Sequence, residues 1–203
     1  MDNGIRNTLL AIAAFIFAII GLLIANVVVP RPMSPEQMQA IGFYQFEQSR
    51  EISEFKMIDH LGNNVGLIEF KGTWTLLFFG FTTCPDICPT TLGILNEALK
   101  DLDEPPQVIM VTVDPERDTS EKLKNYVPAF NSNFRGFVGS FDQTVRLAEQ
   151  LNVAFGKIPG SEAGTYLVDH TASIVLIDPE ARYFGFIKAP HRSQHIASII
   201  RSL

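Results

Sequence analysis

A run of 22 residues without a charge, Thr8–Val29 (TLLAIAAFIFAIIGLLIANVVV), constrains this chain more than any other feature of its sequence. A helix needs roughly 20 apolar residues to cross the hydrocarbon core of a bilayer. A cleaved secretory signal has a shorter apolar stretch, of about 7–15 residues, that ends in an Ala-x-Ala-like site. No good site of that kind lies near Ala25. The run therefore predicts a retained transmembrane helix rather than a cleaved signal.

This helix divides the chain into a tail at residues 1–7, an anchor at 8–29, a linker at 30–51 and a folded domain at 52–203. Positive charges on the two sides of the anchor are nearly balanced and do not fix its orientation. A short tail before a single span commonly stays in the cytoplasm, so we expect the domain to be exported. A mitochondrial presequence would be rich in Arg and Ser and poor in acids, and the start MDNGIRN is neither. We therefore expect a single-pass protein of a bacterial inner membrane with its C-terminal domain in the periplasm.

The net charge and the number of cysteines argue against a nucleic-acid-binding protein and against a fold held together by disulfides. The formal net charge of -6 argues against nucleic acid as a partner. An exported domain lies in a compartment that permits disulfides, but a small fold stapled by disulfides would carry more than two cysteines. The hydrophobic content of 46% is ample for an apolar core. The cysteine pair is therefore expected to serve chemistry rather than stability.

Apolar runs alternate with amphipathic stretches through the predicted domain. Residues 74–82 (WTLLFFGFT) and 105–114 (PPQVIMVTVD) are typical of central strands that are buried on both faces. Leu92, Leu95 and Leu99 recur at helical spacing between them. Further elements are expected as a hairpin around 60–64, a strand at 134–140, two strands within 171–187, and helices at 119–130, 141–152 and 192–203. This order predicts an α/β fold, a thioredoxin-like central sheet flanked by helices and preceded by the transmembrane helix.

Both cysteines lie in one segment, CPDICP, directly after the first apolar run. Pro85 suits the first position of a helix, so Cys84 is expected at the positive end of the helix dipole, which favours a thiolate. Cys88 follows one turn later on the same face, so the two sulfurs can meet. The carboxyl ends of strands in α/β sheets are where ligands bind. We therefore expect the functional site at this junction.

Three uses of such a pair stay open on the residues alone. A redox couple is possible, although its spacing differs from Cys-x-x-Cys. A structural zinc site usually needs four ligands, which two cysteines do not supply. A soft metal such as Cu(I) suits thiolates and accepts imidazole, and it would need a histidine brought to the sulfurs by the fold.

His170 is the histidine that we expect to complete such a site, because it lies just before an apolar strand whose entry loop should pass the cysteines. His60 is expected in a solvated turn, and His191 and His195 on an exposed face of the last helix. The segment Pro159–Gly164 (PGSEAG) precedes His170 and is expected to be mobile.

Three segments together resemble the Sco/SenC family: CPDICP, VTVDPERDT at residues 111–119, and VDHTASIVLID at residues 168–178. The resemblance covers roughly Glu54 to the C terminus and includes the anchor. It implies a membrane-anchored, thioredoxin-like copper protein that helps to assemble the binuclear copper centre of cytochrome c oxidase. Matched position by position, the family's copper ligands fall on Cys84, Cys88 and His170.

The resemblance implies a chaperone for a copper ion, Cu(I) or Cu(II), whose partner is the copper-accepting subunit of cytochrome c oxidase. A thiol reductant or another copper carrier would be a further partner. The alternative is a thiol–disulfide oxidoreductase that keeps the acceptor's cysteines reduced, and a third option is a copper or redox sensor. Thioredoxin enzymes usually place a cis-proline opposite their thiols. Here Thr171, Ala172 and Ser173 occupy that region, which favours the metal site.

Two acids in VTVDPERDT lie near the expected site. Asp114 ends a strand, where it would either orient a ligand or loop or form the turn before Pro115. Asp118 is expected to be a polar residue near a helix start.

Overall fold

The computed structural model describes residues 3–28, 33–160 and 165–203. The chain divides into two compact units, residues 1–32 and 33–203. Every residue of the described hydrophobic core belongs to the second unit. The globular domain therefore begins near Met33 and has a core of its own.

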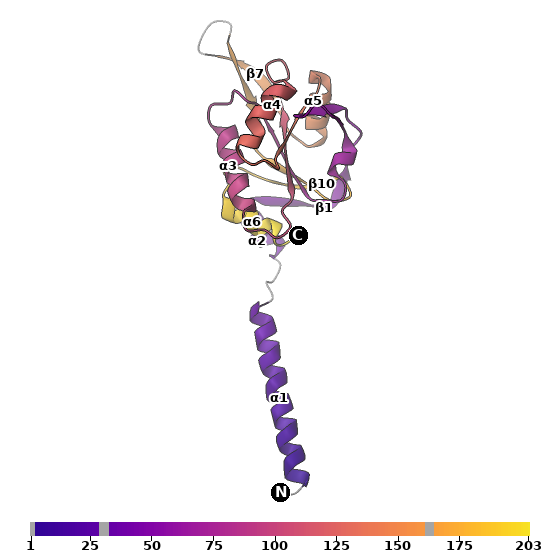
Figure 1. The fold of residues 1–203 in the computed structure, drawn as a ribbon, viewed down its shortest axis with the longest axis vertical. Coiled ribbons are helices and arrows are strands. Elements are labelled where there is room, and N and C mark those ends of the chain that lie inside the picture. Colours follow the sequence, from indigo (N-terminus) through magenta and orange to yellow (C-terminus); the bar gives the residue numbers. More distant parts are fainter. Residues whose placement is uncertain (1–2, 29–32, 161–164) are drawn as a thin grey trace. The chain divides into compact units, whose positions relative to one another are not determined.

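The first unit contains one helix, α1 (Asn3–Val28), shown in indigo in Figure 1. Its stretch Gly4–Leu23 has a mean hydropathy of 2.1 and none of it is buried inside the structure. By length and composition this helix is able to cross a membrane. It begins earlier than the predicted anchor, because the short polar tail continues the same helix.

The predicted linker at residues 30–51 is wrong over most of its length. Helix α2 (Pro35–Ala40) begins at a capping box on Ser34, and β1 (Phe43–Glu51) joins the main sheet as the antiparallel partner of β10 (Arg182–Ile187). Most residues of β1 are exposed or half-buried, because it is an edge strand. Their polar character hid the strand from sequence reasoning, although Phe43 is fully buried.

The domain is built on an eight-stranded sheet in the order β1-β10-β9-β4-β5-β6-β2-β3. Strands β4, β5 and β6 run parallel, and the other neighbours pair antiparallel. Their bounds are β2 (Met57–Asp59), β3 (Asn64–Val65), β4 (Thr75–Gly80), β5 (Gln107–Thr112), β6 (Arg135–Val138) and β9 (Ile174–Ile177).

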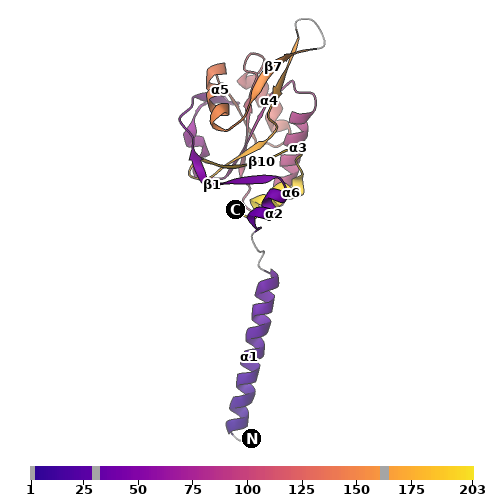
Figure 2. The ribbon, with the colours of Figure 1, turned by 180° about the vertical axis from the view of Figure 1, so that it is seen from behind.

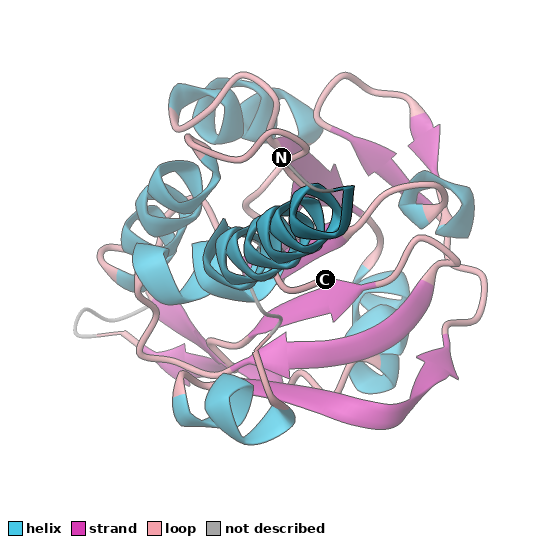
Figure 3. Ribbon diagram, turned by 90° about the horizontal axis from the view of Figure 1, so that it is seen from below, coloured by secondary structure: helices cyan, strands magenta, loops and turns pink. Residues whose placement is uncertain are grey.

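Helices surround this sheet, as Figure 3 shows in cyan. They are η1 (Leu67–Phe70), α3 (Ile87–Leu99), α4 (Ser120–Tyr126), η2 (Val127–Ala129), α5 (Phe141–Gln150) and α6 (Ser193–Ile200). Helices α3 and α6 contact each other. The arrangement confirms the predicted thioredoxin-like α/β sheet flanked by helices.

The two central strands β4 and β9 are buried along their whole length. Their uninterrupted apolar sequences follow from this position, because both faces of the central sheet are covered. The parallel strands β4 and β5 end at the same edge of the sheet. The loop that leaves β4 there carries the cysteine segment.

A separate two-stranded sheet, β7 (Phe155–Pro159) and β8 (Tyr166–His170), was not predicted. Figures 1 and 2 show β7 extending away from the main sheet. His170 is the last residue of β8 rather than a loop residue. Residues 161–164, where mobility was expected, lie outside the described residues.

Candidate metal centre

Cys84 lies in the loop between β4 and α3, three residues before the helix. The helix begins at Ile87 with Asp86 as its N-cap, so the predicted start at Pro85 is wrong. A residue that precedes proline is disfavoured in the helical region, and Cys84 instead makes a turn in which its N–H donates to Phe81 O at 3.2 Å. Cys88 occupies the first turn of α3 and is completely buried.

The N-terminus of α3 still acts on Cys84, but from outside the helix. The Cys88 N–H donates to Cys84 Sγ at 3.4 Å. First-turn amides have no partner within their own helix, and they carry its positive partial charge. This donor therefore stabilises negative charge on the Cys84 sulfur. Both cysteines are free thiols, and Cys84 is partly exposed.

Burial raises the pKa of the Cys88 thiol, and its neighbour Cys84 raises it further. Without a metal, Cys88 therefore keeps its proton at neutral pH. A metal ion must displace that proton in order to bind the sulfur.

His170 reaches the cysteines across 82 residues of sequence, with its Nε2 at 3.7 Å from Cys88 Sγ. Its Nδ1 lies 3.1 Å from Thr171 O. A carbonyl only accepts hydrogen bonds, so this contact assigns the ring proton to Nδ1 and leaves a lone pair on Nε2 facing the sulfurs. Burial lowers the pKa of His170, which favours the neutral ring. The rings of Phe78 and Phe81 pack against the His170 ring at steep angles, with centroids 6.0 Å away.

The two sulfurs and a nitrogen of the His170 ring all lie within 4.8 Å of one another. Metal bonds of about 2.0–2.3 Å place two ligands of one ion roughly 4 Å apart. One ion would therefore fit after an inward shift of about 1 Å or less. Two sulfurs and an imidazole form a donor set that suits a soft metal.

Beside the three ligand atoms lies an open pocket of about 230 Å³. Cys84 and His170 line it, whereas Cys88 does not. An ion at this centre would therefore be reached from outside past Cys84.

Asp114 lies two residues after the end of β5 and is buried. Its carboxylate pairs with Arg117 and accepts a hydrogen bond from the Tyr166 hydroxyl at 2.8 Å. Tyr166 begins β8, the strand that ends in His170. The Asp114 side chain thus ties the hairpin to the domain, and its backbone carbonyl accepts the N–H groups of Arg117 and Asp118 in the turn that follows. Asp114 is not part of the metal-ligand cluster.

Asp118 is the residue whose importance sequence reasoning missed. It is buried and accepts hydrogen bonds from the Thr82 N–H at 2.9 Å, the Thr82 hydroxyl at 2.5 Å and the Thr112 hydroxyl at 2.6 Å. Thr82 lies two residues before Cys84, so Asp118 fixes the start of the cysteine loop. The sequence offered only a polar residue before a helix.

Two of the remaining histidines differ from expectation. His60 is buried and its Nδ1 accepts the Gly136 N–H at 3.3 Å, so it is not solvated. His191 precedes α6, and its Nε2 lies 2.7 Å from Ala172 O. It supports the loop after β8 instead of lying on an exposed helix face. His195 is half-buried on α6. None of the three belongs to the metal-ligand cluster found among the described residues.

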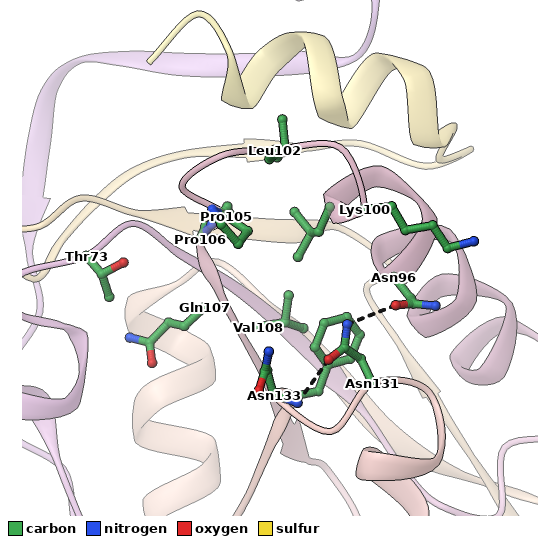
Figure 4. Close-up of a pocket in the computed structure, with 12 residues that line it drawn as sticks. Thr73, Asn96, Lys100, Leu102, Pro105, Pro106, Gln107, Val108, Asn131 and Asn133 are labelled. Carbon is green, nitrogen blue, oxygen red and sulfur yellow. Dashed lines mark hydrogen bonds between the residues drawn. The ribbon is translucent and has the colours of Figure 1, made fainter.

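A larger pocket, of about 460 Å³, lies at the opposite end of α3 and β5 (Figure 4). There Asn131 donates to Asn96 at 2.9 Å, and the Asn133 N–H donates to Asn131 at 2.9 Å. The residues that line this pocket include no Cys, His, Asp or Glu. The cysteine edge of the sheet is therefore the stronger candidate site.

Comparison with known proteins finds relatives that are named for copper or were solved with copper bound. A relative from Stutzerimonas stutzeri that is named for copper binding is 36% identical over 148 residues, which are 70% of this chain and 72% of the relative. The mitochondrial SCO2 homologue of Danio rerio is 33% identical over 82% of this chain, which spans only 63% of that protein. The structure of Bradyrhizobium japonicum ScoI with copper bound has a TM-score of 0.66 and 35% identity, and covers 74% of this chain and 98% of that chain.

The description SCO1/SenC is that of the family model that matches residues 45–203, from the first strand of the sheet to the C terminus. This match includes Cys84, Cys88 and His170 and confirms the resemblance seen in the sequence. The chain belongs to the SCO1/SenC family.

Proposed function

We propose that this chain is a copper chaperone that binds one copper ion through Cys84, Cys88 and His170 and delivers it to the binuclear copper site of cytochrome c oxidase. The observation that carries the proposal is the cluster of two sulfurs and one imidazole nitrogen within 4.8 Å. Family membership supports copper as the cargo, because the related B. japonicum structure holds copper.

Each ligand would contribute differently to binding. The His170 ring is neutral and offers Nε2 without losing a proton, because Nδ1 carries the hydrogen. The buried Cys88 thiol releases its proton when copper binds. The Cys84 sulfur already accepts the Cys88 N–H and is the ligand closest to solvent.

Three protein ligands leave a position open for a ligand from an acceptor. The pocket beside Cys84 gives that ligand access to the ion. Transfer would then proceed by ligand exchange, in which an acceptor thiolate or imidazole binds before a ligand of this chain leaves. Copper keeps its charge throughout, so the exchange needs no electron donor.

The apolar helix α1 would anchor the chaperone in a bacterial inner membrane with the domain in the periplasm. Its length and hydropathy support a span. The anchor confines the search for the oxidase subunit to the membrane surface. A thiol reductant would keep the cysteines available in an oxidising compartment, and another copper carrier would load them.

Copper binding by the full-length chain in detergent tests the ligand set. We expect one copper per chain, and His170→Ala should weaken Cu(I) binding by about 100-fold or more, since even a residue that only supports a metal ligand is worth about 10–100-fold. The matched control is His195→Ala, which removes a half-buried histidine outside the cluster. Affinity is measured by competition with a chromophoric Cu(I) chelator. Equal affinity for the His170→Ala variant and the parent would exclude the three-ligand scheme.

A thiol–disulfide oxidoreductase is the second candidate, favoured by the contrast between a partly exposed Cys84 and a buried Cys88. An exposed thiol can attack a partner disulfide, and the buried thiol can then resolve the mixed disulfide. Reduction of insulin distinguishes the two functions. Rapid turnover that persists in His170→Ala would favour the oxidoreductase, whereas slow turnover with tight copper binding supports the chaperone.

A further inference from the structure

The pocket beside the metal centre is rimmed by exposed aliphatic side chains. Ile87, Ile158 and Leu167 line it together with Cys84 and His170, and they are 51%, 46% and 43% exposed. We call these three aliphatic residues the apolar rim. Single exposed aliphatic residues are ordinary on a protein surface, but a set gathered around one opening marks an interaction site.

The rim is assembled from elements that are far apart in the sequence. Ile158 and Leu167 are directly paired across the β7–β8 hairpin, so their side chains leave the same face of that small sheet. Ile87 is the first residue of α3. The hairpin that carries His170 and the helix that carries Cys88 thus both present an aliphatic side chain at the mouth of the site.

Negative charge accompanies the rim. Asp86 and Asp169 are exposed and line the same pocket, and no Lys or Arg is among the residues that line it. The chain as a whole has a formal net charge of -6. A partner that covers this mouth would therefore be favoured by positive charges around its own contact surface.

The geometry of copper exchange decides which kind of partner covers the rim. An acceptor ligand that shares the ion must come within roughly 4 Å of the ligands of this chain. Cys88 is completely buried, so that approach passes the Cys84 side, through the pocket. An acceptor must therefore bury the rim while it takes the metal. A lipid surface has no thiolate or imidazole with which to do so.

We propose that the apolar rim is the docking surface for a copper-accepting protein. That protein presents an apolar patch that holds its own copper ligands, with Lys or Arg beside them. This inference rests on the proposed chaperone function and specifies the chemistry of its partner.

The test compares copper transfer to a protein with copper release to a small molecule. Full-length chain in detergent, loaded with Cu(I), is mixed with the metal-free copper-binding domain of the oxidase subunit from the same organism. Copper on each protein is measured after rapid separation. Ile158→Ser/Leu167→Ser should slow transfer about tenfold or more, because the docked complex loses much of its apolar contact. Ile68→Ser is the matched control, since Ile68 is 65% exposed and does not line the pocket.

Copper release to a chromophoric Cu(I) chelator should be equal for all variants, because a small chelator does not need the rim. This readout also shows that the variants keep an intact metal centre. If the serine pair disturbs the hairpin and chelator release changes, Ile87→Ser on α3 tests the same surface independently. Raising the salt from about 20 to 200 mM should slow transfer of the parent severalfold by screening the attraction between the partners.

Transfer that is equally fast from the parent and the rim variants would overturn the docking surface and leave the chaperone function standing. A parent that loads the chelator but never the oxidase domain would overturn both. If the rim variants lose only self-association of this chain and keep the parent's transfer rate, the rim binds a second copy of this chain instead. A transfer defect seen in lipid nanodiscs but not in detergent would assign it to the membrane. An unchanged rate at high salt would refute the basic partner.

Discussion

Replacing the buried carboxylate of Asp114 by an amide should weaken both the domain and its metal centre, although Asp114 contacts no metal ligand. In the parent, Asp114 pairs with Arg117 and accepts the Tyr166 hydroxyl at 2.8 Å. Arg117 also donates from Nη1 to Tyr166 O at 3.0 Å, and its guanidinium lies 3.9 Å above the Tyr166 ring. One carboxylate thus holds a cation and a phenol that together fix the start of β8.

The size of the effect follows from these contacts. A hydrogen bond to a charged group contributes about 1.5–3 kcal/mol. The amide in Asp114→Asn retains one acceptor oxygen but leaves Arg117 without its counter-charge. The Arg117 side chain is 29% exposed, so solvent offsets part of that loss. We expect Asp114→Asn to lower the free energy of unfolding by about 2–3 kcal/mol. Tyr166→Phe removes only the phenol bond and should cost about 1.5 kcal/mol.

The substitution Asp114→Asn should also affect His170, at the other end of strand β8. His170 lies four residues beyond Tyr166, or about 13 Å along an extended strand. A loosened hairpin must be ordered again when His170 binds copper. We expect copper affinity to fall about tenfold, which corresponds to about 1.4 kcal/mol, while both cysteines still bind.

Urea unfolding of residues 33–203, followed by circular dichroism, measures the stability, and chelator competition measures the affinity. The double variant Asp114→Asn/Tyr166→Phe should cost less than the sum of the single variants, because Asp114→Asn already weakens the charge-assisted hydrogen bond that Tyr166→Phe removes. Unchanged stability and affinity in Asp114→Asn would refute the anchoring role. Strict additivity in the double variant would show that the two side chains act independently.

Three further changes test other parts of the structure. Burial lowers the pKa of His60, so on acidification the unfolded chain takes up a proton before the folded chain does, and stability should fall as the pH drops below about 6.5. In a plot of the urea midpoint against pH, His60→Gln should reduce the slope in this range, and an unaltered slope would contradict the reasoning. A Cβ at Gly80 would meet the Cys88 sulfur at 3.0 Å, so Gly80→Ala should lower the free energy of unfolding by about 1–3 kcal/mol by overpacking and should weaken copper binding. Unfolding and copper affinity equal to those of the parent would argue against a tight fit. Asp118→Ala leaves the Thr82 donors unpaired and should cost about 2–4 kcal/mol; undiminished thermal stability with normal protection of the Thr82 amide in hydrogen exchange would exclude its role in the cysteine loop.

Local patterns in the sequence predicted the main elements of the domain. Buried strands such as β4 read as unbroken apolar runs, and α3 carries leucines at helical spacing. Strands with exposed faces gave no such signal. In β1, β7 and β8 most residues are exposed or half-buried, so sequence reasoning assigned one to a linker and missed the other two.

The sequence likewise predicted one part of the candidate site and not another. The spacing of Cys84 and Cys88 after a predicted central strand indicated that the two sulfurs would lie close together. The helix geometry assumed for this was wrong at Cys84, which lies in the loop before α3. The expected thioredoxin-like layout, and then the resemblance to a family, suggested that His170 lies near the cysteines, but neither predicted the strand that carries it. Its place beside Cys88 depends on a hairpin that pairs with none of the central strands.

The tertiary structure alone decided the surroundings of these ligands. In the folded chain the ring proton of His170 lies on Nδ1, and Cys88 is buried while Cys84 stays accessible. Asp114 holds the β7–β8 hairpin and Asp118 holds the start of the cysteine loop. Apart from the contact of His170 Nδ1 with the neighbouring Thr171 O, these properties depend on contacts between residues that are 36 to 82 positions apart. Helix and strand periodicity reflects interactions with near neighbours along the chain, whereas burial and hydrogen-bond partners at such separations exist only after the sheet and hairpin have closed around them.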